Sequence, residues 1–275
     1  MFASVHRMAC VLAGLAVVVM LVGAASAEPL ITGLVENNRN MAVPAGIRTS
    51  ATHPSPSGTS AELKDEAFVF VNRTHEYTAV RTDANGLLTT DPNGTLQPFP
   101  SYLIGAEYIQ LANENRTQNP YSLDVTLSQP VIAYLFLDNR LNGPGLNNTS
   151  SNTTDPVLGG VLQWVIDDGW VRVNTGFMPN GQADYLGVDE GGTVADESLR
   201  VHTGTGLVAG SGNGLNQFFA IYTKQFPAGT HIGFTKTQGI TGNMYGVAVV
   251  PVPEPSTMAL LVAGLLGLFW VGRQR

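Results

Sequence analysis

Short apolar segments alternate with polar turns through the middle of the chain, and their lengths are typical of β-strands. The clearest alternation lies at 121–127, where Tyr, Leu, Val and Leu occupy one face and Ser, Asp and Thr the other. Residues 67–71 and 131–137 are nearly all apolar and rich in β-branched or aromatic side chains, as buried strands are. No central stretch keeps apolar residues at helical spacing over three turns.

Weaker strand patterns complete the prediction, with turn signals between them. They lie at 30–35, 77–81, 102–111, 217–224, 230–234 and 244–250. About ten short strands at this spacing predict an all-β fold with a single β-sandwich or jelly-roll-like domain. A β-helix would need a fixed repeat, and the Asp-x-Asn-Gly turns at 83–86 and 91–94 do not continue as one.

The sequence from 161 to 173 predicts a tight hairpin. Two apolar runs, 161–166 and 170–173, flank Asp167-Asp168-Gly169, and Asp-Gly is the preferred chemistry of a two-residue turn. Trp164 and Trp170 would then lie close together on paired strands. One of them could face outward and stack on a sugar ring, although burial of both is the simpler interpretation.

Composition divides the chain into segments. Residues 28–61 are rich in Pro, Ser and Thr without sustained periodicity, which predicts a flexible arm apart from an edge strand at 30–35. Residues 142–156 are a predicted loop, and the acidic stretch 184–198 is predicted to be loop with a short extended piece. The β-domain is expected to span 62–250, because Pro251 and Pro253 follow its last strand.

The N-terminus has the pattern of a secretory signal peptide at 1–27. A weakly basic start precedes an apolar core at 11–22, and Ala25 and Ala27 form an A-x-A cleavage site. Cleavage after Ala27 leaves Glu28 as the mature N-terminus, so export through the Sec translocon is expected.

The C-terminal tail, 251–275, carries the most specific pattern in the chain. Its hexapeptide consists of Val252, Pro253, Glu254, Pro255, Ser256 and Thr257. An uncharged apolar run at 258–272 follows, predicted to be a short transmembrane helix, and then Arg273 and Arg275. This order resembles the PEP-CTERM sorting signal of Gram-negative-type bacteria. The resemblance implies that an exosortase recognises the Pro-Glu-Pro motif and processes the protein at the envelope. An ordinary tail anchor would not require that motif.

Three runs in the central region also resemble segments of uncharacterised exported PEP-CTERM proteins. They are 68–77, 100–109 and 134–140. This second resemblance implies a single domain and adds no mechanism.

Charge and cysteine content exclude several classes of function. The two ends hold three of the 14 basic residues and one of the 21 acidic ones, so the central region carries a net charge of about −9. An acidic surface repels phosphate backbones, so no nucleic-acid partner is expected. The single Cys10 precedes the apolar core of the signal peptide, which excludes lipoprotein anchoring and leaves the mature chain without disulfides or thiolate metal sites.

Catalytic patterns are weak. No Gly-x-Ser-x-Gly or His-Glu-x-x-His motif occurs, and carboxylates near predicted strand ends are the remaining candidates for a glycosidase pair. These carboxylates belong to Glu107, Asp138, Asp168, Asp189 and Glu190. We assign no catalytic residue and expect a non-enzyme, with a polysaccharide-active enzyme as the alternative.

Calcium is the best candidate for a metal, as a structural ion and not a catalytic cofactor. Hard cations prefer carboxylate, amide and carbonyl oxygens. The candidate ligands are Asp83, Asn85, Asp91, Asn93, Asp189 and Glu190. Turn formation explains the two Asn-Gly sites without a metal.

Together these patterns predict an exported, non-catalytic β-domain of the cell envelope or extracellular matrix. Its expected partners are the Sec translocon, an exosortase, the membrane before processing, and surface polysaccharide contacted through Trp164 or Trp170.

Overall fold

The computed structural model describes the β-domain with gaps. The described residues are 28–39, 45–48, 63, 67–70, 75–91, 93–118, 121–141, 153–191, 214–235 and 243–253. The predicted signal peptide with Ala25 and Ala27, the sorting motif from Glu254 onward and the predicted helix at 258–272 lie outside them.

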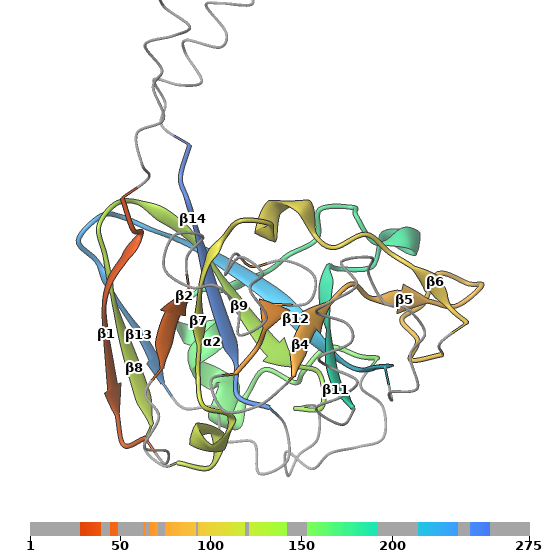
Figure 1. Cartoon of the computed structure of the whole chain (residues 1–275), viewed down its shortest axis with the longest axis horizontal. Helices are drawn as coiled ribbons and strands as arrows, with labels where there is room; N and C mark the ends of the chain where they lie inside the picture. The colour runs from red at the N-terminus through yellow and green to blue at the C-terminus, as the bar shows by residue number, and fades with distance from the viewer. Residues whose placement is uncertain are drawn as a thin grey trace, which may run out of the picture.

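A small antiparallel sheet forms one layer of the domain (Figure 1). It consists of β1 (Ile31–Asn37), β8 (Ser122–Leu127) and β13 (His231–Thr235), with β8 in the centre. The alternation predicted at 121–127 is confirmed, because Leu123, Val125 and Leu127 are buried and the residues between them are partly exposed. This layer therefore buries one face and exposes the other.

A larger nine-stranded sheet forms the rest of the core. Its order is β2 (Gly46–Arg48), β7 (Glu107–Gln110), β14 (Gly246–Pro251), β9 (Val131–Asp138), β12 (Gly214–Phe226), β11 (Tyr185–Gly191), β4 (Glu76–Thr78) and β3 (Ala67–Phe68), with β10 (Val171–Arg172) also paired to β12. The sheet curls, since Phe70 just after β3 forms a parallel bridge with Leu111 just after β7. Leu63 reinforces this closure by backbone hydrogen bonds to Gly105 and Ala106.

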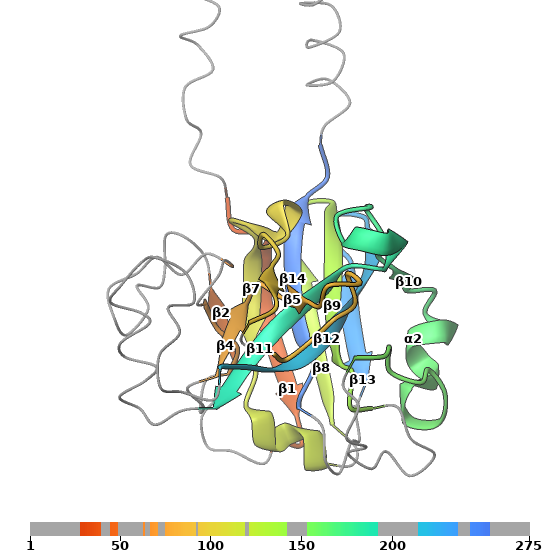
Figure 2. The ribbon, with the colours of Figure 1, turned by 90° about the vertical axis from the view of Figure 1, so that its right-hand side faces the viewer.

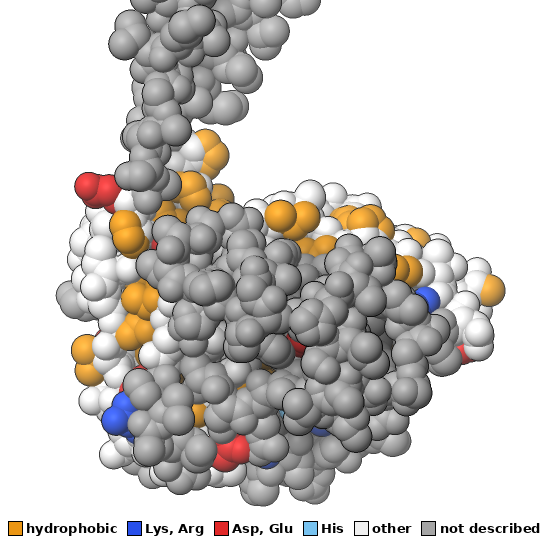
Figure 3. All heavy atoms as spheres, in the orientation of Figure 1, with side chains coloured by type: hydrophobic (Ala, Val, Ile, Leu, Met, Phe, Trp, Pro, Cys, Tyr) orange, Lys and Arg blue, Asp and Glu red, His pale blue; other side chains and the backbone are white. Residues whose placement is uncertain are grey.

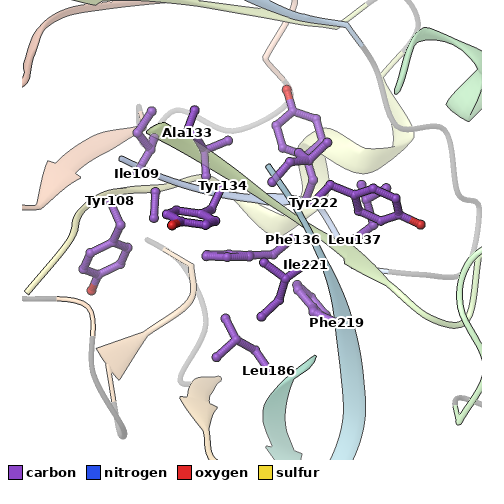
Figure 4. Close-up of a cluster of buried hydrophobic side chains, with 14 of the residues drawn as sticks. Tyr108, Ile109, Ala133, Tyr134, Phe136, Leu137, Leu186, Phe219, Ile221 and Tyr222 are labelled. Carbon is purple, nitrogen blue, oxygen red and sulfur yellow. The ribbon is translucent and has the colours of Figure 1, made fainter. Parts of the chain in front are cut away.

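The central strands are buried on both faces. In β9 every residue from Ala133 to Asp138 is buried, and in β14 every residue from Gly246 to Val249 is. Figure 4 shows side chains from β7, β9, β11 and β12 meeting inside the curl, among them Tyr108, Phe136 and Phe219. Both faces are covered, one by the small sheet, which explains why 131–137 is a continuous apolar run instead of an alternating one.

Shorter elements lie around the sheets. A two-stranded ribbon of β5 (Arg81–Thr82) and β6 (Thr95–Leu96) projects to the right in Figure 1. The helical turns are η1 (Ser101–Leu103), η2 (Asn113–Thr117), η3 (Gly160–Leu162), η4 (Pro179–Gly181) and the one α-helix of the described residues, α2 (Gln163–Asp167). Because strands dominate, the predicted all-β class is confirmed.

The hairpin predicted at 161–173 is wrong, because residues 163–167 form α2. The amide of Asp168 donates to the carbonyl of Trp164 at 2.9 Å, and Gly169 follows with φ of 73°. A left-handed glycine ends a helix as readily as it forms a hairpin turn, so Asp-Gly fits both. The second run does become extended, as β10, but it pairs with β12 and not with 161–166.

Two other boundaries differ from the prediction. In the segment 28–61, β1 confirms the edge strand predicted at 30–35, but β2, at 46–48, was expected to be part of a flexible arm and instead pairs with β7 in the large sheet. The acidic stretch 184–198 was expected to be loop with a short extended piece, and its extended part is the seven-residue β11, which pairs with both β12 and β4. In both places cross-strand hydrogen bonds compensate for weak local strand propensity.

Candidate functional site

The sorting tail leaves the domain directly from a central strand. Pro251, the last residue of β14, pairs with Val131, and the Val252 amide donates to the Pro130 carbonyl at 3.1 Å. Pro253 is the last described residue. The first residue of the sorting hexapeptide is therefore still hydrogen-bonded to the folded domain.

The N-terminal end of the domain is held at the same turn. Ser128, two residues before Pro130, donates its hydroxyl to the Pro29 carbonyl at 2.6 Å and its amide to the Leu30 carbonyl at 2.9 Å. Figures 1 and 2 show the start of β1 and the end of β14 at the same end of the molecule. One β8–β9 turn thus fixes both ends of the domain. We call the surface formed by 28–30, 101–105, 128–130 and 251–253 the tail end.

Glu107 also holds the N-terminal end of the domain in place. Its carboxylate accepts the amides of Leu30 and Ile31 at 2.8 and 2.9 Å. Burial raises the pKa of this carboxyl, although the two amide hydrogen bonds act in the opposite direction. Glu107 was a candidate catalytic acid, and in the structure it anchors the entry to β1.

Exposed apolar side chains and prolines characterise the tail end. Ile104, just after η1, is 55% exposed, and Pro29, Pro130 and Pro251 are also exposed. Figure 3 shows hydrophobic side chains around the base of the tail and over the neighbouring lobe, with no Lys or Arg among them in this view.

Asp138, another candidate acid, lies in a buried polar network. It is fully buried, and its carboxylate accepts the backbone and guanidinium of Arg140 and the Asn243 amide at 2.7 Å. The Asn243 side chain in turn contacts Asn113 and Gln217 at 2.9 and 2.7 Å. The network joins the loop after β7 to the ends of β9, β12 and β14, so its geometry is structural.

Arg172 is the centre of a second cluster, which has no signature in the sequence. Its guanidinium forms a two-pronged ion pair with Asp155 at 2.9 and 3.1 Å and donates to the carbonyls of Asp184 and Ile221 at 2.6 and 2.9 Å. It also lies over the Tyr185 ring, 4.4 Å from the ring centroid. These contacts tie the segment before α2 to β10, β11 and β12.

Tyrosine hydroxyls extend the Arg172 cluster. Tyr185 donates to Asp155 at 2.6 Å, while Tyr102 and Thr175 donate to Asp184 at 3.0 and 2.7 Å. Burial raises the pKa of Tyr185 to about 12, and the neighbouring Asp155 adds to this shift. The carboxylates of Asp155 and Asp184 are thus occupied by contacts within the chain.

The two tryptophans pack against the core. Trp170 is 7% exposed, with its ring 5.7 Å from that of Phe226, and Trp164 is half-buried with its ring 6.1 Å from that of Tyr245. Trp164 belongs to α2 and Trp170 immediately precedes β10, so they are not cross-strand neighbours. Packing accounts for both rings.

The candidate calcium ligands on the projecting ribbon are used by their own turns. Asp83 accepts the amides of Asn85 and Leu87 at 2.9 and 2.8 Å, and Asp91 accepts the backbone and side-chain amides of Asn93 at 2.9 and 3.0 Å. The hydrogen bonds that Asp83 accepts, above all the one from the Leu87 amide, lower the pKa of the Asp83 carboxyl.

Of the remaining candidates, Asp168 is an exposed residue at the end of α2. The side chains of Asp189 and Glu190 lie outside the described residues, so a calcium site there stays a prediction. Within the described ranges, no three His, Cys, Asp or Glu residues are placed to hold a metal ion together. None of the helices in those ranges is long and apolar enough to cross a membrane.

Comparison with known proteins identifies the tail and leaves the domain unassigned. The PEP-CTERM protein-sorting motif matches residues 251–275, which confirms the predicted signal and its extent. A search of curated proteins found no match. The motif marks the chain as an exported, exosortase-sorted protein of the cell surface or envelope.

One solved structure is similar, a β-glucuronidase from glycoside hydrolase family 2. The similarity has a TM-score of 0.41 at 13% identity, covering 81% of this chain and 15% of that one. The chain thus spans about 15% of that enzyme's length, and a likeness of this size assigns no activity to it.

Proposed function

We propose, from the PEP-CTERM sorting motif at 251–275, that the protein is a non-catalytic envelope or matrix component whose β-domain is the cargo of a removable tail. The observation that carries the proposal is the junction at Val252, where a finished domain passes into the motif without an intervening linker. The domain closes its core without the tail, so removal of the tail leaves the fold intact.

The non-catalytic part of the proposal is supported by the roles of the described carboxylates. Glu107 holds the entry to β1, Asp138 holds Arg140 and Asn243, and Asp155 holds Arg172. A glycosidase needs two carboxyl groups roughly 5 to 10 Å apart and free to reach the substrate. Each of these carboxylates is instead committed to a structural contact.

Contact with surface polysaccharide remains part of the proposal, although Trp164 and Trp170 do not support it. The acidic, Asn- and Thr-rich exterior is compatible with hydrated glycans. Incubating the processed protein with surface polysaccharide from the bacterium that produces it distinguishes polysaccharide binding from polysaccharide cleavage. Co-sedimentation without new reducing ends favours binding, whereas release of reducing ends favours the carboxylate-pair enzyme.

Replacing Pro253, Glu254 and Pro255 by alanine tests the sorting function. We expect full-length protein to accumulate in the membrane fraction, because the processing enzyme loses its recognition sequence while the apolar run stays. Immunoblotting of membrane and released fractions measures this, with Gln274→Ala as the control for a neutral change in the tail. Unchanged release of the alanine variant would exclude exosortase processing.

A further inference from the structure

We infer that the tail end is a membrane-apposed surface, which rests against the lipid headgroups while the sorting tail is still attached. This inference rests on the proposed function, because it requires 258–272 to enter the bilayer. It adds an orientation: the tail end faces the lipid and η2 faces away from it.

The first support is the short distance between the domain and the membrane segment. Val252 is fixed to Pro130, and Met258 begins the apolar run. Six residue steps in an extended, proline-rich conformation span about 19 Å. The headgroup layer takes up roughly 5 to 8 Å of this length, so the tail end stays within about 14 Å of the outer edge of the headgroups.

The second support is the rigidity of the exit. The chain leaves as the continuation of β14, which is paired with β9 on one side and β7 on the other. The same turn that receives Val252 also receives Pro29 and Leu30 through Ser128. Since the tail leaves from a strand that is paired on both sides, the point of attachment is fixed within the tail end and the orientation of the domain is restricted.

The third support is the chemistry of the surface. Ile104 is a large aliphatic side chain that is 55% exposed with no packing role in the core, and exposed prolines surround the exit. Figure 3 shows Lys and Arg side chains away from this end. A surface of this kind gains from contact with the apolar part of the headgroup region. Its one charged side chain is the exposed Glu28, whose carboxylate has to remain hydrated.

A fluorophore near Ile104 tests the orientation. The mature chain, 28–275, contains no cysteine, so Ser101→Cys places a single label in η1. The labelled protein is reconstituted into phosphatidylcholine vesicles containing headgroup-spin-labelled lipid. The matched control carries the label through Thr117→Cys in η2, at the opposite end in Figures 1 and 2. We expect several-fold stronger quenching at Ser101 than at Thr117.

Two variants sharpen the test. A twelve-residue Gly-Ser insertion between Val252 and Pro253 adds about 20 Å of flexible reach and should bring quenching at Ser101 close to that at Thr117. Ile104→Glu places a charge on the surface and should lower quenching at Ser101 without affecting Thr117.

Flotation with the vesicles distinguishes the possible failures. Protein that floats but shows equal quenching at both positions overturns the orientation and leaves the sorting function standing. Protein that does not float overturns both, because the tail has not entered the bilayer. If the quenching of the label at position 101 changes with the amount of protein per vesicle and not with the amount of spin-labelled lipid, the tail end contacts a second copy of the chain, and the inference is overturned.

Discussion

At the scale of single residues, the aromatic interior of the curled sheet is centred on Tyr77. Its ring makes edge contacts with Tyr108, Phe136 and Phe219, with ring centroids 5.5 to 6.4 Å apart. Its hydroxyl is fully buried, and no described residue forms a hydrogen bond with it. A buried hydroxyl without a partner costs free energy, so packing of the ring has to offset it.

Tyr77→Phe is therefore expected to preserve the fold and to stabilise it by up to about 1 kcal/mol, because the ring remains and the desolvated hydroxyl is removed. Urea denaturation of the processed protein measures the change. Tyr121→Phe is the control, since its hydroxyl donates to Glu36 at 2.8 Å and its loss should destabilise. A comparable loss of stability in both variants would contradict the prediction.

Gly246 explains how the Tyr77 ring fits. A Cβ at this position would clash with the Tyr77 hydroxyl and lie 2.7 Å from Cδ2 of Phe136. Overpacking of this kind typically costs about 1 to 3 kcal/mol. The strand requires glycine here because of the neighbouring rings and not because of its own backbone angles.

At the scale of elements, the short segment of β10 is held by Arg172 more than by its ladder. β10 has two residues and pairs with only Thr223 and Tyr222. The guanidinium adds connections to Asp155 and to three backbone carbonyls. A planar guanidinium can satisfy these acceptors simultaneously, whereas an ammonium cannot.

Arg172→Lys should therefore destabilise the domain by about 2 kcal/mol, because the charge is kept but the two-pronged pair is lost. Thermal unfolding followed by circular dichroism measures this. Arg81→Lys is the matched control, since Arg81 donates to one carbonyl, that of Gly94, at 2.8 Å and should change stability by less than about 1 kcal/mol. Equal effects at the two positions would show that the Arg172 cluster contributes no more than a surface contact.

At the scale of the whole molecule, buried tyrosines connect the stability of the fold to alkaline pH. Burial raises the pKa of each of these tyrosines above its usual value of about 10. They are Tyr77, Tyr102, Tyr121, Tyr134, Tyr185, Tyr222 and Tyr245. The folded state therefore keeps protons that the unfolded chain releases.

The sign of the pH dependence follows. The stability contributed by these groups is fully present below about pH 10 and is lost as the pH rises towards their folded values, such as the value of about 12 for Tyr185. We expect the urea midpoint to be flat near neutral pH and to fall steeply above about pH 10. Tyrosinate absorbance should appear together with unfolding. Titration of most tyrosines near pH 10 in a protein that stays folded would contradict this prediction.

The C-terminal sorting tail and the class of the fold could be predicted from sequence because each depends on local pattern. The Pro-Glu-Pro tail needs no tertiary partner to be recognised, and its extent at 251–275 is confirmed. The alternation at 121–127 and the apolar run at 131–137 became β8 and β9, since side-chain periodicity reflects which faces of a strand are covered.

Tertiary structure decided what local chemistry leaves open. The sequence Asp168-Gly169 is suited equally to a hairpin turn and to the end of a helix. In the fold it ends α2, and the rings of Trp164 and Trp170 pack against different partners, Tyr245 and Phe226. The positions of Asp155 and Arg172, 17 residues apart, follow from the pairing of β10 with β12 and have no sequence signature. By itself the sequence determined where the protein is sent and that its cargo is built of strands. Only the fold placed Pro29 and Val252 on one turn, because the contacts of Pro29 with Ser128 and of Val252 with Pro130 join residues about 100 or more positions apart.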